Sequence, residues 1–223
     1  EGLLNGGSFS FGFQPTGNTE FKLTHERVYG EVEYEGFTQS GSGLSTKTKE
    51  KFDLFSIRYK RRLGNINGLT DLNWHVSTAL NHRNWERKIQ PSSAALGLNE
   101  NYSWNELDFS IEGDYKISAS GMLTSKIGMF FGFNEKIDVD LSEVGAGKPS
   151  FHFGKVNGQN FNLGYKYLLN TSSEISLLVS YQYWHFDRSG VHSINIGPRR
   201  INLTEPESDM HRAAVHVQFR SIF

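Results

Sequence analysis

Apolar side chains in this chain recur at every second residue, a spacing typical of β-strands and not of amphipathic helices. Successive side chains of a strand point to opposite faces, so a segment with this spacing has one apolar and one polar face. In the segment 210–223 the apolar face carries Ala213, Val215, Val217, Phe219 and Phe223. The polar face of the same segment carries Arg212, His216, Gln218 and Arg220. The pattern predicts a two-sided strand.

Seven further segments show the same alternation, which predicts an almost entirely β protein. The eight predicted strands are 6–14, 50–63, 70–82, 105–117, 121–133, 160–169, 173–186 and 210–223. The chain has no run of 18 apolar residues, which excludes a helical membrane span. It has no Cys, which excludes disulfides and thiolate chemistry, and its net charge of −1 argues against nucleic acid as a partner.

The connections between these segments alternate between short and long. The short ones are 64–69, 118–120 and 170–172, and the long ones are 15–49, 83–104, 134–159 and 187–209. An antiparallel meander of eight strands places its long loops together at one end. We therefore expect one domain over 1–223, an all-β, eight-stranded antiparallel up-and-down barrel. Because Val28, Val32 and Tyr34 continue the alternation inside 15–49, we read a hairpin beyond the rim there, with ten strands as the alternative.

The charged residues lie mostly on the polar faces of the predicted strands. They are Arg58, Lys60, Arg62, Lys126, Lys166, Arg212 and Arg220, with Glu106, Asp108, Glu112, Asp114 and Glu174. A soluble ligand-binding barrel turns its apolar face inward, whereas a bacterial outer-membrane barrel turns it outward to lipid. Short turns opposite long loops, and aromatic residues near the ends of the apolar bands, favour the transmembrane barrel.

The final segment carries the most specific resemblance. The alternation from His211 through Val215, Val217 and Phe219 to Phe223 resembles the assembly signal of the small outer-membrane β-barrel superfamily of Gram-negative bacteria. Members similar to the OmpA membrane domain and the Ail-type proteins share the short-turn, long-loop layout. The resemblance implies a bacterial outer-membrane location, short turns in the periplasm, long loops outside, and lipid and lipopolysaccharide as partners. No basic, apolar leader opens the chain, so we expect the mature form if it is exported.

In a barrel of eight strands the interior is filled by its own side chains, so the inward charges are expected to form a structural network. Segment 105–117 would supply the carboxylates Glu106, Asp108, Glu112 and Asp114. Segment 50–63, two strands away, would supply Arg58, Lys60 and Arg62. Because an unpaired buried ion is costly, we expect pairing across the barrel. A small solute channel lined by the same residues is the alternative.

Two constellations resemble those of outer-membrane enzymes. His75 and Ser77 resemble part of the His-x-Ser-Asn arrangement of PagL-type lipid A deacylases, but Thr78 stands where that arrangement has Asn, and both side chains are predicted to face the lumen. Asp138 with Asp140, and His185 with Asp187, resemble the rim residues of omptin-like proteases, in the reversed order His-x-Asp. For His75 and Ser77 we favour a polar lining of the lumen, and for the four rim residues we favour solvated loop charges. An outer-membrane enzyme is therefore the alternative function and not the first choice.

The predicted function rests on the loops. The basic residues of the last loop, Arg188, Arg199 and Arg200, and the acidic residues of the first, Glu31, Glu33 and Glu35, are candidate binding residues for an extracellular protein or glycan. The eight His residues show no metal-ligand spacing, and no phosphate-binding glycine loop is present, so we predict no metal and no cofactor. We expect a surface interaction or envelope-structural protein.

Overall fold

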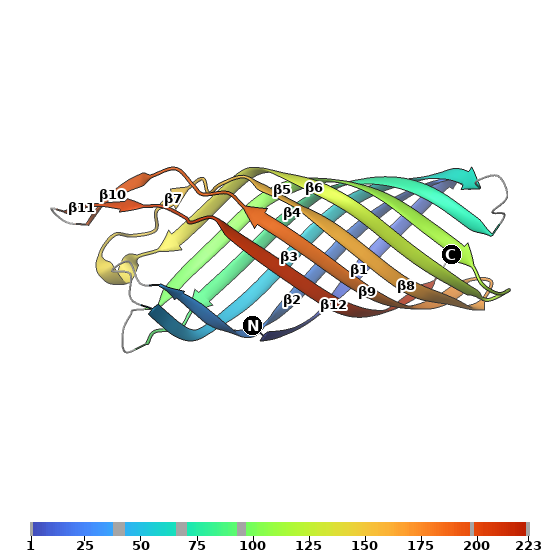
Figure 1. Ribbon diagram of the computed structural model, residues 1–223, viewed down its shortest axis with the longest axis horizontal. Helices are drawn as coiled ribbons and strands as arrows, with labels where there is room; N and C mark the ends of the chain where they lie inside the picture. The colour runs from blue at the N-terminus through green and yellow to red at the C-terminus, as the bar shows by residue number, and fades with distance from the viewer. Residues whose placement is uncertain (1, 38–42, 66–70, 93–96, 197–198, 222–223) are drawn as a thin grey trace.

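The protein folds into one long antiparallel β-meander with short additional elements at one end (Figure 1). The computed structural model describes residues 2–37, 43–65, 71–92, 97–196 and 199–221. The long strands are β1 (Gly2–Thr16), β2 (Thr19–Phe37), β3 (Gly43–Asn65), β4 (Leu72–Ile89), β5 (Leu98–Lys116), β6 (Gly121–Asp140), β8 (Val156–Asn170), β9 (Ser173–Phe186) and β12 (Ser208–Ser221). The short elements are η1 (Ser142–Val144), β7 (Ser150–Phe151), β10 (His192–Ile196) and β11 (Arg199–Leu203).

The main sheet follows the chain in the order β1-β2-β3-β4-β5-β6-β8-β9-β12, with β7 attached to β6. This confirms the antiparallel up-and-down topology. Over the described ranges the sheet has ten strands, nine long ones and the two-residue β7, so the expected eight is too low. The count agrees with the ten-strand alternative, but that alternative placed both added strands within 15–49, where only β2 lies. The additional long strand is β2, which pairs with β1 and β3 along its length.

The prediction of a long loop over residues 15–49 is therefore wrong. Only Gly17 and Asn18 separate β1 from β2, and β2 is a full strand of the sheet. Sequence reasoning missed this strand because its outward face becomes polar after Leu23, where His25 and Arg27 follow. The resulting pattern has no complete apolar face, although the strand is hydrogen-bonded on both sides.

The other predicted loops are shorter than expected because the strands continue past their apolar parts. The connections 90–97, 141–155 and 187–207 replace 83–104, 134–159 and 187–209. They lie at the end of the sheet that carries β7, β10 and β11, opposite the short turns 117–120 and 171–172 (Figure 1). The predicted turn 64–69 falls mostly outside the described residues, as does the terminal Phe223.

The two faces of the sheet differ sharply in character. Large apolar side chains on the outward face are exposed, for example Ile127 at 63%, whereas the inward Glu106 is 0% exposed. On β5 the exposed apolar residues run from Leu107 to Ile117, just past the end of the strand. A tilted strand segment of this length gives a band about 25 Å tall, the height of the lipid-facing band of outer-membrane barrels.

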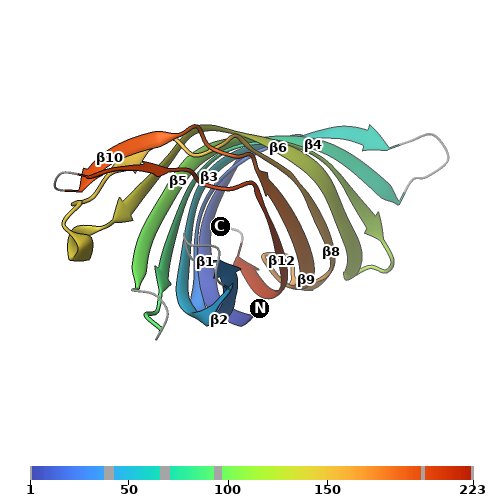
Figure 2. The ribbon, with the colours of Figure 1, turned by 60° about the vertical axis from the view of Figure 1, so that its left-hand side comes forward.

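The sheet is strongly curled, with β1 and β12 as its edge strands (Figure 2). In the part of the chain that the structure describes, β1 pairs only with β2, and β12 only with β9. The Arg212 guanidinium of β12 nevertheless reaches the Glu26 carboxylate of β2, at 2.5 Å. Buried inward side chains occur from β2 to β9, for example Val28, Glu50 and Trp184, whereas the inward Ser8 and Ser10 of β1 are exposed. No helix in the described ranges is long and apolar enough to cross a membrane.

Candidate functional site: the charged inner wall and its aromatic end

The centre of the inner wall is a cluster of ion pairs around Glu112 of β5. Its carboxylate lies 2.7 Å from a guanidinium nitrogen of Arg58 and 2.8 Å from the Lys60 ammonium, both on β3. The Ser77 hydroxyl of β4, the strand between them, donates a third bond at 2.8 Å. These partners meet because alternation turns the even-numbered residues of β3 and β5 inward. The cross-strand pairing expected from the sequence is thus present at this point.

Two further inward carboxylates of β5 are paired in the same way. Asp108 lies 3.5 Å from the Lys126 ammonium of β6, and Asp114 lies 3.3 Å from the Lys166 ammonium of β8. Asp114 also lies 3.7 Å from the Lys60 ammonium. The carboxylates of one strand therefore tie together β3, β5, β6 and β8. Because removing one member of a buried ion pair leaves the other unpaired, the network is strongly interdependent.

Other inward charges of the prediction find partners outside this cluster. Arg212 pairs with Glu26, Arg220 lies 3.9 Å from Glu174, and Arg62 donates to the Asn73 side chain. Inward residues of β2, β3, β4, β9 and β12 thus also take part in polar pairing.

Glu106 is the most deeply buried carboxylate of the wall. It accepts a hydrogen bond from Arg83 at 2.7 Å and from the indole nitrogens of Trp104 and Trp184 at 2.8 and 3.0 Å. The Arg83 guanidinium also lies over the Trp184 ring, 5.0 Å from its centre. Glu106 was expected to face inward, but its tryptophan partners were not, because they lie past the apolar band on faces that the sequence marks only as polar.

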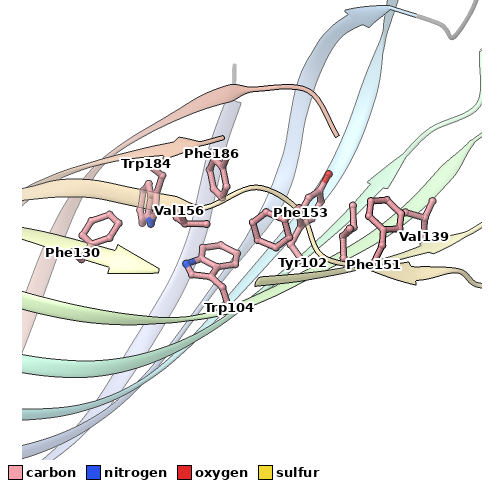
Figure 3. Packing of buried hydrophobic residues seen from close by; sticks show 10 residues of the cluster. Tyr102, Trp104, Phe130, Val139, Phe151, Phe153, Val156, Trp184 and Phe186 are labelled. Carbon is pink, nitrogen blue, oxygen red and sulfur yellow. The ribbon is translucent and has the colours of Figure 1, made fainter. Parts of the chain in front are cut away.

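A cluster of buried, mostly aromatic residues continues the inner wall (Figure 3). It lies toward the end of the sheet that carries β7, β10 and β11, called the loop end from here on. Its buried members are Tyr102, Trp104, Phe130, Ile137, Val139, Phe151, Phe153, Val156, Trp184 and Phe186. Phe151 and Phe153 come from the connection 141–155, which turns these two side chains inward against the strands. The Phe153 ring packs edge-on against Trp104 and Tyr102. This connection therefore lines the interior as well as joining two strands.

Arg87 forms a second buried charge centre beside this cluster. Its guanidinium lies 2.5 Å from Glu100 and donates to the Tyr102 hydroxyl at 2.9 Å. It also lies over the rings of Trp85, Tyr102 and Tyr34, at 5.2, 5.3 and 5.7 Å from their centres. Arg87 was not predicted, because its position past the apolar band gave no signal in the alternation.

Glu205 attaches the connection 187–207 to this centre. Its carboxylate accepts a hydrogen bond from the Tyr102 hydroxyl at 2.7 Å. Its backbone nitrogen donates to the Ser189 hydroxyl at 2.8 Å, which joins the two ends of the connection. Burial, reinforced by the neighbouring Glu100, raises the pKa of the Glu205 carboxyl above its ordinary value. The connection is thus anchored by a carboxyl whose charged form is disfavoured.

His75 and Ser77 do not form a nucleophile–base pair. Both face the lumen, as expected, but the Ser77 hydroxyl donates to Glu112 and the His75 Nδ1 atom lies 3.8 Å from Asp114. No hydrogen bond joins His75 to Ser77 in the described residues. The geometry is that of a polar lining, without an activated serine.

The four rim residues do not converge on one water molecule. Asp138 and Asp140 point outward and pair with Lys136 and Lys148, at 3.0 and 2.9 Å. His185 lies 2.8 Å from Asp209 and 3.2 Å from Asp187. In register, His185 is opposite Asn157 and Asn157 opposite Phe131, seven residues before Asp138. Seven strand residues span about 23 Å, too far for a shared water.

The candidate loop residues occupy different settings. Glu31, Glu33 and Glu35 lie on β2 and not in a loop, and Glu31 is 2.9 Å from the Lys47 ammonium. Arg188 is exposed in the connection 187–207, and Arg200 of β11 donates to the Ser193 hydroxyl at 3.0 Å. Arg199 begins β11, and its side chain lies outside the described part. No group of three potential metal-ligating side chains occurs among the described residues.

The comparisons with known proteins identify no family for this chain. No family model matches the chain, and no curated protein matches it. Among solved structures it is similar to "OmpT (in-vitro folded), an outer membrane protein of Vibrio cholerae", with a TM-score of 0.33 and 11% identity. The match covers 96% of this chain and 56% of that one, so the chain spans little more than half the length of the structure that it matches.

That similarity is too low to carry a functional argument, so the assignment depends on the chain's own geometry. The structure has an antiparallel up-and-down sheet that is curled, with exposed apolar side chains on its outer face and paired charges on its inner face. This is the arrangement of outer-membrane β-barrel proteins.

Proposed function

We propose that the chain forms the wall of a bacterial outer-membrane β-barrel and acts in surface interaction or envelope structure through the connections at its loop end. The single observation that carries the proposal is the contrast along β5. Its outward residues Leu107, Phe109 and Ile111 are exposed and apolar, while its inward residues Asp108 and Glu112 are buried and ion-paired. In water the outward face would be a large unsatisfied apolar surface, whereas in a bilayer it is the lipid-facing band.

The pairing of the inward charges supports a structural role for them. Glu112, Asp108 and Asp114 each contact cations from neighbouring strands, so the charges hold strands together and do not present a path of one sign. A channel that selects by charge uses rings of like-charged side chains instead. We therefore assign recognition to the exposed loop-end segments, including the hairpin formed by β10 and β11.

Reconstitution into planar bilayers tests this assignment. We expect the protein to insert from detergent, and Glu112→Ala and Arg58→Ala to lower its unfolding midpoint while leaving the bilayer current unchanged. The exposed Glu143 of η1 provides a matched control, since Glu143→Ala removes the same carboxylate without touching the network. A steady ion conductance that rises in Glu112→Ala would favour the solute channel over the structural role. A protein that stays dispersed in buffer without detergent would contradict the membrane assignment.

A further inference from the structure

The two edge strands of the sheet, β1 and β12, run in the same direction. Over the described ranges nine long strands follow one another, and every neighbouring pair is antiparallel. The first and ninth strands of such a series both run from the loop end to the end with the short turns, called the turn end here. Direct pairing of β1 with β12 would therefore be parallel, an arrangement that is less stable per residue.

Each edge strand has one side without a neighbouring strand. Among the described residues β1 pairs with β2 alone, and β12 with β9 alone. Val215 and Val217 of β12 are 69% and 75% exposed, against 52% for Val179 of β9, the register partner of Val215. Phe11 of β1 is 64% exposed, against 48% for Phe109 of the interior strand β5. In hydrocarbon the backbone groups of such an edge have no water to bond to, so the edge needs a partner strand.

The seam, meaning the unpaired edges of β1 and β12, is crossed inside the sheet by one ion pair. Arg212 of β12 lies 2.5 Å from Glu26 of β2, on the far side of β1. Inward side chains span two strands elsewhere, because the Trp184 indole of β9 donates to Glu106 of β5 at 3.0 Å, with β6 and β8 between them. With β1 and one added strand between them, Arg212 and Glu26 would span the same number. The contact is thus compatible with one strand in the seam.

Residues 1–223 offer no spare segment for this position. A transmembrane strand needs about 9–11 residues, whereas β10 and β11 have five each and the stretches between the described ranges have five or fewer. The connection 141–155 is held inside by Phe151 and Phe153. A second copy of the chain, inserted in the same orientation, presents edges that run in the same direction and would also pair in parallel.

We infer that the seam binds one extended strand of a partner polypeptide, antiparallel to both β1 and β12. The inference rests on the proposed membrane location, because in water an open edge can bond to solvent. The strand would run from the turn end to the loop end, with apolar residues outward. Its inward residues would be polar and uncharged, because Ser8, Ser10 and Gln218 beside the seam are uncharged and Arg212 already has a carboxylate partner. The added strand would give ten long strands, an even number as in bacterial outer-membrane barrels.

The test uses the full chain inserted in phosphatidylcholine vesicles and a synthetic peptide with the sequence of residues 173–183, carrying Val179→Cys. In the sheet this sequence is an antiparallel partner of β12, so it has the required alternation. Single cysteines are placed in the edge strands in turn, as Phe9→Cys, Phe11→Cys, Phe13→Cys, Val215→Cys, Val217→Cys and Phe219→Cys. The control Leu163→Cys lies on the outward face of β8, which is paired on both sides. Oxidation should link the peptide to at least one position on each edge strand, at least about ten-fold above the control, since a disulfide requires neighbouring backbones.

A second peptide, with Ser173→Cys as its first residue, reports the direction of the bound strand. An antiparallel strand places this residue at the turn end. It should therefore link to Phe13→Cys on β1 and Phe219→Cys on β12, and not to Leu3→Cys near the loop end. Linking to Leu3→Cys alone would overturn the antiparallel arrangement.

The other occupants of the seam are tested without peptide. Phe11→Cys/Leu23→Cys joins register partners of β1 and β2 and should form a disulfide, which shows that β1 is in place. Phe11→Cys combined with Val215→Cys, Val217→Cys or Phe219→Cys should form none. A disulfide in one of these, disulfide-linked dimers of the single variants, or equal linking of the peptide at Leu163→Cys would overturn the inference and leave the proposed function standing. Failure of the parent to insert would instead overturn the proposed function, and the inference with it.

Discussion

Single inward carboxylates determine how the wall of this sheet is held together. Glu112 contacts Arg58 and Lys60, and Ser77 between them donates to the same group. Three strands thus depend on one side chain that is shielded from water. The ion pairing between the inward charges of segments 50–63 and 105–117 was predictable. Alternation determines which face each charge occupies, and the strand order determines how far apart the two segments lie. The choice of Glu112 as the shared acceptor was not, since it depends on register.

The residue-scale prediction concerns this acceptor. Glu112→Gln keeps the size of the side chain but removes the charge that Arg58 and Lys60 share, and it should lower the free energy of unfolding by about 3 kcal/mol. Urea unfolding in vesicles, followed by tryptophan fluorescence, measures the change. The exposed Glu143→Gln should change it by less than about 0.5 kcal/mol. A loss at Glu112 no larger than that of the control would contradict a structural role for the network.

Elements of this fold were predictable in proportion to how much apolar face they carry. The strands β5, β6, β8 and β9 each contain a long run of apolar outward residues and were found from alternation alone. β2 was missed because its outward face turns polar after Leu23. The inward position of Phe153 and the bond from Tyr102 to Glu205 could not be predicted, because the partners lie far apart in sequence and no periodicity links them.

The polarity of the strand faces gives the first prediction at the scale of elements. Ile111 and Asn99 both lie on the outward face of β5, Ile111 inside the apolar band and Asn99 beyond it. Ile111→Arg should therefore destabilise the membrane-inserted protein by about 2–4 kcal/mol, and Asn99→Arg by less than about 1 kcal/mol. Unfolding equilibria in vesicles measure both changes. Equal effects at the two positions would show that the band does not face lipid.

The connection 187–207 gives a second prediction at this scale, through the raised pKa of Glu205. The folded state favours the protonated carboxyl, so anchoring is strongest below the ordinary pKa of glutamic acid and weakens as the pH rises through the raised value. Hydrogen-exchange protection of the Ser189 and Glu205 amides should fall over that window. Glu205→Gln stays neutral and can keep the bond from Tyr102, so its protection should stay flat. The same decline in the variant would assign the effect to another group.

At the scale of the whole molecule, the central claim is that the outer face of the curled sheet meets hydrocarbon and the inner face meets water or paired charges. Neighbouring residues of one strand test this claim, because they point to opposite faces. Phe11 and Ser10 form such a pair on β1, and Leu163 and Asn162 form one on β8. The natural chain has no Cys, so a single cysteine at each position can carry a fluorophore without competing thiols.

Fluorescence quenching by brominated lipids in vesicles is the most direct measurement of that claim. Labels at Phe11→Cys and Leu163→Cys should be strongly quenched, while labels at Ser10→Cys and Asn162→Cys, one residue away, should be quenched weakly. The reverse order, with the positions of Ser10 and Asn162 in contact with lipid, or equal quenching at all four positions, would contradict the account.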